Sequence, residues 1–152
     1  MIPRPVRLAA LLALTVPTAL ALAACDGPTP ADLFVVQRTG SIAGARLTMR
    51  VVDDGAVYCN RDTRRHPISS DQLIRARALA HLLDGDQDKD KQGLDQEHLH
   101  LKPGAISTLS YSIRSEEGTV SFSDTSPKQP QAFYDLAALT RELAKGPCGL
   151  AR

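Results

Sequence analysis

The stretch "ARLTMRVVDDGAVYCN" (Ala45–Asn60) decides the fold, because two strand-like segments meet there at an Asp-Asp-Gly turn signal. Apolar residues alternate with Arg and Thr before the turn, which is typical of a strand with one buried face. A three-residue loop with Gly55 in the left-handed conformation puts the apolar residues of both segments on one side. These residues are Leu47, Met49, Val51, Val57 and Cys59. A two-residue Asp-Gly turn would place Val57 and Cys59 opposite Arg50, away from the core, so we predict the three-residue loop.

Strands are expected on both sides of this hairpin. The segment "LFVVQR" (Leu33–Arg38) reads as a strand that is apolar on both faces, and "ISTLSYSIRSEEGTVSFSD" (Ile106–Asp124) reads as a second hairpin. The apolar residues of the second hairpin are Leu109, Tyr111, Ile113, Val120 and Phe122. They share one face only if the loop has an even number of residues, so we predict two or four residues around Glu116 to Gly118.

The first predicted helix lies in "HPISSDQLIRARALAHLLDG", residues 66–85. Ser69 or Ser70 can cap its N-terminus, and Asp71 suits its first turn. The helix should end near Asp84 and Gly85. Its apolar stripe consists of Leu73, Ala76, Leu79, Ala80 and Leu83.

The second predicted helix lies in "SPKQPQAFYDLAALTRELAKGPC", residues 126–148. Pro127 or Pro130 begins it, and Gly146 with Pro147 ends it. Its buried face consists of Phe133, Leu136, Ala137, Leu139, Thr140 and Leu143. The order βββ-α-ββ-α then predicts one α+β domain over residues 32–152, with a mainly antiparallel sheet and both helices on one face.

The N-terminal segment has the form of an export signal. A short basic start is followed by the uncharged run Leu8 to Ala24, which is shorter than a membrane-spanning helix needs and is interrupted by Pro17. The sequence Leu22-Ala23-Ala24-Cys25 resembles the lipobox of bacterial lipoproteins. This resemblance implies a signal peptide over residues 1–24, a diacylglycerol on Cys25, and a location on the extracytoplasmic face of the bacterial cell membrane. Residues 25–31 would form the lipid anchor and a short tether.

The number of cysteines agrees with this interpretation. The chain has three, and an odd number in an exported protein needs an explanation. If Cys25 carries lipid, Cys59 and Cys148 remain, and outside the cytoplasm two such thiols tend to form a disulfide. We therefore predict a Cys59–Cys148 disulfide, with two buried free thiols as the alternative.

The composition limits the partners. Basic and acidic residues number 18 and 17, Trp is absent, and aromatic residues make up 4% of the chain. Because the charges nearly cancel, the chain has no strong electrostatic field to attract nucleic acid, and few of its side chains could stack on bases. We expect no nucleic-acid partner and no cofactor. The expected partner is the membrane, through the N-terminal lipid, together with an envelope protein that the sequence does not identify.

The segment "DQDKDKQGLDQE" (Asp86–Glu97) contains the most tempting metal motif. Acidic residues occupy four ligand positions of a twelve-residue calcium loop: Asp86, Asp88, Asp90 and Glu97. The sixth position, however, holds Lys91 where such loops need Gly, and Pro103 leaves little room for an exit helix. We therefore expect no metal site, and interpret the segment as part of a long solvated loop over residues 84–105.

Two further clusters favour solvated loops over sites. His98 and His100, in "EHLH", could share one face of an extended segment and bind a transition metal. The basic cluster "RDTRRHP" (Arg61–Pro67) could contact lipid phosphates or wall polymer. In both cases we expect simple solvation.

Catalytic motifs are scarce in the sequence. It has no GxSxG elbow and no Ser-x-x-Lys, and the Ser and Asp residues of "SFSDTS" (Ser121–Ser126) are explained by the end of a strand. The body loosely resembles uncharacterised small lipoproteins of high-GC Gram-positive bacteria in "VYCN", "GTVSFSDTS" and "LAALTRELAKGPCGL". The sequence thus favours a non-enzymatic, membrane-anchored binding or interaction module. The alternative is a cell-envelope hydrolase or a hydrolase inhibitor.

Overall fold

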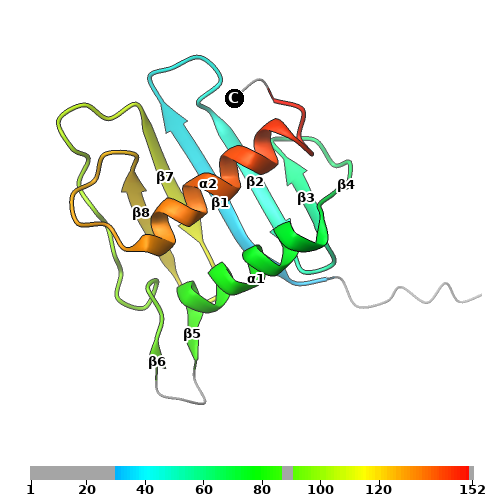
Figure 1. Cartoon of the computed structure of the whole chain (residues 1–152), viewed down its shortest axis with the longest axis horizontal. Coiled ribbons are helices and arrows are strands. Elements are labelled where there is room, and N and C mark those ends of the chain that lie inside the picture. The colour runs from blue at the N-terminus through cyan, green and yellow to red at the C-terminus, as the bar shows by residue number, and fades with distance from the viewer. Residues whose placement is uncertain (1–29, 87–90, 151–152) are drawn as a thin grey trace, which may run out of the picture.

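The computed structural model describes residues 30–86 and 91–150 (Figure 1). The predicted signal peptide, Cys25 and nearly all of the tether lie outside these residues. The described part forms two layers, a β-sheet and a pair of helices that cover one of its faces (Figure 1). This is the α+β arrangement that the sequence predicts.

Six strands make up the sheet, in the order β4-β3-β2-β1-β7-β8, with every neighbouring pair antiparallel. Their bounds are β1 Asp32–Gly40, β2 Leu47–Val52, β3 Ala56–Cys59, β4 His66–Pro67, β7 Leu109–Arg114 and β8 Thr119–Ser123. A separate two-stranded ribbon pairs β5 (Gly85–Asp86) with β6 (Lys91–Gln92). The first strand thus lies at the centre, because the second hairpin joins its free edge.

Both hairpins have the strand registers that the alternation of apolar and polar residues predicts. Val52 pairs with Ala56 across a three-residue loop, and Gly55 within that loop has φ +80°. Arg114 pairs with Thr119 across a four-residue loop. Every apolar residue that we assigned to the core side of the first hairpin is buried, including Cys59. The three-residue loop is confirmed, and the second loop takes the longer of its two predicted lengths.

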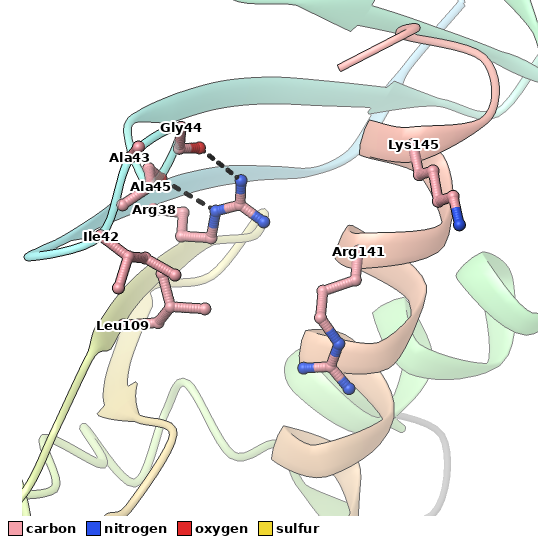
Figure 2. Close-up of a pocket in the computed structure, with 8 residues that line it drawn as sticks. All are labelled: Arg38, Ile42, Ala43, Gly44, Ala45, Leu109, Arg141 and Lys145. Carbon is pink, nitrogen blue, oxygen red and sulfur yellow. Dashed lines mark hydrogen bonds between the residues drawn. The ribbon is translucent and has the colours of Figure 1, made fainter. Parts of the chain in front are cut away.

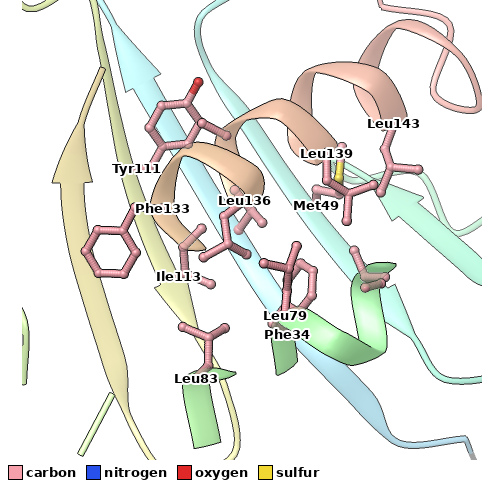
Figure 3. Close-up of a cluster of buried hydrophobic side chains, with 14 of the residues drawn as sticks. Phe34, Met49, Leu79, Leu83, Tyr111, Ile113, Phe133, Leu136, Leu139 and Leu143 are labelled. Carbon is pink, nitrogen blue, oxygen red and sulfur yellow. The ribbon is translucent and has the colours of Figure 1, made fainter. Parts of the chain in front are cut away.

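Helices α1 (Ser70–Asp84) and α2 (Gln131–Lys145) pack their apolar stripes onto the sheet. Ser69 is the N-cap of α1, and it forms a capping box with Gln72. Pro130 is the N-cap of α2. The core between the layers contains large side chains from both hairpins and both helices, among them Tyr111, Phe133 and Leu136 (Figure 3). Phe122 stacks between Tyr111 and Phe133, with ring centroids 5.1 Å and 4.4 Å away.

The end of the predicted polar loop is more structured than we expected. Leu94, Leu99 and Leu101 pack against the core, and Asp95 is completely buried. The backbone on both sides of His100 bonds Ser121 at the outer edge of β8. Residues 99–101 therefore lie along the outer edge of β8, and the leucines of this segment add to the core. Interpreting them as a merely solvated loop was wrong.

Candidate ligand-binding site

A cavity of about 390 Å³ lies between the β1–β2 loop and the C-terminal half of α2 (Figure 2). This volume is within the range of small-molecule sites. Eight described residues line it: Arg38, Ile42, Ala43, Gly44, Ala45, Leu109, Arg141 and Lys145. Three of these are cations, none is acidic, and the remaining five are small or apolar.

Arg38 forms the sheet side of the cavity. It follows Phe34 and Val36 on the helix-facing side of β1, and only 2% of its surface is exposed. Its Nε donates to the Ala45 carbonyl at 2.9 Å, and its Nη2 donates to the Gly44 carbonyl at 3.0 Å. The planar guanidinium is therefore held in one orientation by the loop that it supports.

The loop is shaped to bring those carbonyls to Arg38. Ala45 N–H donates to the Ile42 carbonyl at 3.1 Å, which closes a tight turn. Gly44 within the turn has φ +74°, a conformation that glycine adopts without strain. Ser41 N–H donates to the Thr108 carbonyl at 3.1 Å, so the loop is also tied to the chain before β7. One wall of the cavity is thus backbone fixed by hydrogen bonds.

Arg141 and Lys145 form the opposite wall. They lie four residues apart on the exposed side of α2. In Figure 2 the Arg141 side chain runs along the side of the helix that faces the loop, whereas the Lys145 side chain extends away from the loop. Neither forms an ion pair with any other residue in the described part of the chain. Figure 2 shows Arg38 and Arg141 approaching the space between loop and helix from opposite sides.

This arrangement suits an anion with an apolar part. Guanidinium groups bind carboxylate and phosphate through paired N–H donors, while Lys contributes a point charge. Ile42 and Leu109 offer apolar contact beside these cations. The described lining residues provide binding groups and include no Ser, Cys, His or carboxylate that could attack a substrate.

The cysteine pair lies on the same helix-facing side of the sheet as this cavity, but it does not line it. Cys59 at the end of β3 and Cys148 after α2 form a disulfide, with their Cα atoms 5.9 Å apart. The prediction of this bridge is confirmed. It ties the end of α2 to the first hairpin, so it fixes the helix that carries Arg141 and Lys145.

The predicted metal motifs do not come together in the described residues. Asp86 ends β5, Glu97 is exposed in a turn, and Asp88 and Asp90 lie outside the described residues. Within residues 30–86 and 91–150, no three His, Cys, Asp or Glu side chains form a group suited to a metal ion. His98 is exposed in a turn, whereas His100 Nδ1 lies 2.9 Å from Ser121 Oγ. The expectation of no metal site stays a prediction.

The basic cluster at residues 61–67 is largely neutralised by its neighbours. Arg64 bonds Asp62 and holds the pKa of that carboxyl well below its usual range. Arg65 bonds Asp54 at 3.2 Å, and His66 lies 3.4 Å from Asp62. Arg61 is the member of the cluster that faces the open side of the sheet.

The serine and aspartate residues around the end of β8 are structural. Asp124 accepts hydrogen bonds from Ser107 Oγ at 2.9 Å and from the backbone N–H groups of Thr108 and Leu109, each at 3.2 Å. Burial alone would raise the pKa of Asp124, but the hydrogen bonds from Thr108 and Ser107 outweigh it and lower that pKa. Ser126 Oγ accepts from the Ser123 backbone. These bonds join β7 to the end of β8, as expected for residues that end a strand.

Comparison with known proteins adds no relative: no family model, no curated protein and no solved structure matches this chain. In the described part of the chain, neither helix has the length and apolar character needed to cross a bilayer. The cavity itself was not evident from sequence. Arg38 comes after the apolar residues of β1 and looks like the polar end of that strand. Its spacing from Phe34 and Val36 is the signal that could have revealed it.

Proposed function

We propose that this protein is a membrane-anchored extracytoplasmic lipoprotein, and that its domain binds a small amphipathic anion without catalysing a reaction. The observation that carries the binding proposal is the cavity that Arg38, Arg141 and Lys145 line together with apolar side chains. The lipobox at Leu22–Cys25 supports the anchor. The Cys59–Cys148 disulfide supports an oxidising compartment.

The ligand should need both a charge and an apolar part. Arg38 is fixed by Gly44 and Ala45, so its position requires little ordering when a ligand binds. Arg141 and Lys145 are exposed, so they can close around the anion at some cost in side-chain entropy. We expect a modest affinity. The charged groups would orient the ligand, and apolar contact would contribute part of the binding free energy.

Titration calorimetry on the full chain tests this directly. The probes are octyl phosphate, octanol and inorganic phosphate. Octyl phosphate should bind, while octanol lacks the charge and inorganic phosphate lacks the apolar part, so each should bind at least about tenfold more weakly. Equal binding of octanol and octyl phosphate would contradict a cationic site.

Two exposed substitutions locate the binding. The variant Arg141→Gln/Lys145→Gln should weaken octyl phosphate binding by about tenfold or more, since each charge-assisted hydrogen bond contributes roughly 1.5–3 kcal/mol at best and less when exposed. Lys102→Gln is the control, because Lys102 is exposed and does not line the cavity. An equal effect of both changes would indicate nonspecific attraction.

The anchor is tested separately. Replacing Cys25 by Ala should release the protein from membranes, and intact mass should show a diacylglycerol on the unaltered mature chain. Retention of Cys25→Ala in the membrane fraction would indicate an uncleaved N-terminal segment instead.

A further inference from the structure

The face of the sheet opposite the helices gathers arginines that are far apart in sequence. Side chains alternate along each strand, so those between the buried positions of β2 and β7 point away from the helix layer. Four exposed arginines lie on or beside this face: Arg46, Arg50, Arg61 and Arg114. We call this set the arginine face. Because the whole chain is nearly neutral, its net charge does not reveal this local concentration of arginines.

Strand register brings two of these arginines close to each other. Val35 at the centre of the sheet pairs with Arg50 on β2 and with Arg114 on β7. The two arginines therefore lie two strand spacings apart, about 10 Å. Arg50 is also held in place, because its guanidinium lies 4.4 Å from the ring centre of Tyr58 and its Nη1 lies 3.4 Å from Asp32 Oδ1.

Shallow hollows lie between the residues of the arginine face. One of about 340 Å³ is lined by Arg50, Arg61 and Arg114, and another of about 770 Å³ is lined by Arg46 and Arg61. The nearest carboxylate in the first hollow is Asp62, which already bonds Arg64. Asp32 bonds Arg50, and it lines a neighbouring hollow with Arg114 and Glu116. The four arginines therefore outnumber the carboxylates beside them only slightly, but their planar N–H donors suit contact with phosphates.

The chain enters the domain beside this face. The strand β1 begins at Asp32, and Val35 follows about 10 Å along it. Arg114 also lines a hollow of about 320 Å³ together with Ala31 and Asp32, where the tether arrives. Seven residues from Cys25 to Ala31 can span at most about 25 Å. A lipid on Cys25 would therefore hold this end of the sheet within reach of the bilayer surface.

The helix layer also carries cations without an ion pair in the described residues, Arg141 and Lys145, but both line the ligand cavity. The exposed large apolar residues of this layer, Ile74, Leu82 and Tyr134, are separated along α1 and α2. The ligand cavity also opens on the helix side of the sheet, between the β1–β2 loop and α2. A domain that rests on its arginine face would leave this cavity accessible.

We propose that the arginine face lies against the headgroup phosphates of anionic lipids, so that the anchored domain has a fixed orientation on its membrane. The inference rests on the proposed lipid anchor. Basic residues near a bilayer are attracted by its negative surface potential, and this attraction falls off within a Debye length. The contact is therefore electrostatic and weakens at high salt.

Tryptophan fluorescence tests the orientation, because the chain contains no Trp. The variant Tyr58→Trp places a single reporter on the arginine face and keeps an aromatic ring beside Arg50. The variant Tyr134→Trp places the reporter on the exposed side of α2 as a matched control. Each full, lipidated chain is reconstituted into phosphatidylcholine vesicles with or without phosphatidylglycerol, and a spin label on the lipid headgroups quenches any nearby Trp.

The expected result is strong quenching of the Trp at position 58 that depends on phosphatidylglycerol and disappears at high salt. Adding Arg50→Gln and Arg114→Gln should reduce the preference for this orientation by about tenfold or more. The Trp at position 134 should stay unquenched throughout.

Equal quenching at both positions would overturn the proposed orientation. So would a reporter at position 58 that ignores phosphatidylglycerol but responds to soluble polyphosphate, which would make the face a polyanion site. Washing the vesicles separates this failure from failure of the anchor: a chain that lacks the lipid leaves the vesicles, whereas a lipidated chain with a free arginine face stays attached.

Discussion

Cys59 and Cys148, which are 89 residues apart in sequence, are joined by a disulfide that connects the first hairpin to the end of the second helix. The bridge closes residues 59–148, which are most of the folded domain, into one loop, so it restricts the unfolded chain strongly. On the chain-entropy model a loop of this length stabilises the fold by about 4–5 kcal/mol.

Removing this bridge should therefore be costly. The double variant Cys59→Ala/Cys148→Ala should lower the free energy of unfolding by about 4–5 kcal/mol, measured by urea denaturation without reductant. The unaltered protein should lose a similar amount when reductant is added, and the double variant should not respond to reductant. An unchanged midpoint in the double variant would show that the bridge contributes little.

The carboxyl groups of Asp84 and Asp95 lie side by side where α1 meets the turn between β7 and β8. Ser115 Oγ donates to Asp95 Oδ2 at 2.6 Å, and Glu116 N–H donates to Asp84 Oδ1 at 3.2 Å. Asp95 Oδ1 is buried and accepts no hydrogen bond from the described residues. Burial raises the pKa of Asp84 above its ordinary value, and the nearby Asp95 carboxyl adds to this rise, while a hydrogen bond from Ser115 partly offsets it.

This pair should make stability depend on pH. A raised pKa in the folded state means that the contribution of Asp84 is fully present below its unfolded pKa, near 4, and is lost as pH rises through the folded value. The variant Asp84→Asn keeps an acceptor for Glu116 N–H and supplies a donor for Asp95. Relative to the unaltered protein, it should gain stability as pH rises from about 4 to 7.

Urea midpoints across that pH range measure the effect of Asp84→Asn. Glu97→Gln is the control, since Glu97 is exposed in the turn that follows Asp95. Parallel profiles for Asp84→Asn and the unaltered protein would contradict the raised pKa of Asp84.

The sequence predicts where the strands and helices lie along the chain better than it predicts which of them are neighbours in the fold. Alternation fixes which residues of each hairpin are buried, and this in turn limits the loop length, as Val57 and Cys59 show. The position of β1 between β2 and β7 depends on long-range pairing, which no local pattern encodes. Both the ligand cavity and the arginine face depend on that pairing, so neither could be read from the sequence.

Burial of polar residues is the other point at which local reasoning fails. Asp95 follows a charged stretch and looks solvated, yet Leu94 and Leu99 pack on the core and carry it inside. Arg38 looks like the polar end of a strand, yet the loop after β1 folds back over it. In each case tertiary contacts outweigh the local preference for solvent.

The cap of α1 provides a further prediction with a close control. Ser69 Oγ accepts from Gln72 N–H at 3.2 Å, and Gln72 Oε1 accepts from Ser69 N–H at 2.9 Å. Ser69→Ala should lower the free energy of unfolding by about 1 kcal/mol, since it leaves a helix-terminal N–H without its acceptor. Ser70→Ala, at the first residue of the helix, should change it by much less. Equal losses for the two variants would place the cap elsewhere.

Gly55 gives the clearest test of the loop that decides the fold. Its φ of +80° favours glycine, while a Cβ added there would meet only Leu73 Cδ2, at an ordinary contact distance of 3.6 Å. Substitution therefore isolates the backbone cost from any steric clash. Gly55→Ala should lower the free energy of unfolding by about 1–2 kcal/mol, and Gly55→Asn should lower it less, because Asn tolerates the left-handed conformation. Thermal or urea unfolding of the three proteins distinguishes these outcomes. Equal stability of the Ala variant and the unaltered protein would contradict the left-handed conformation of residue 55.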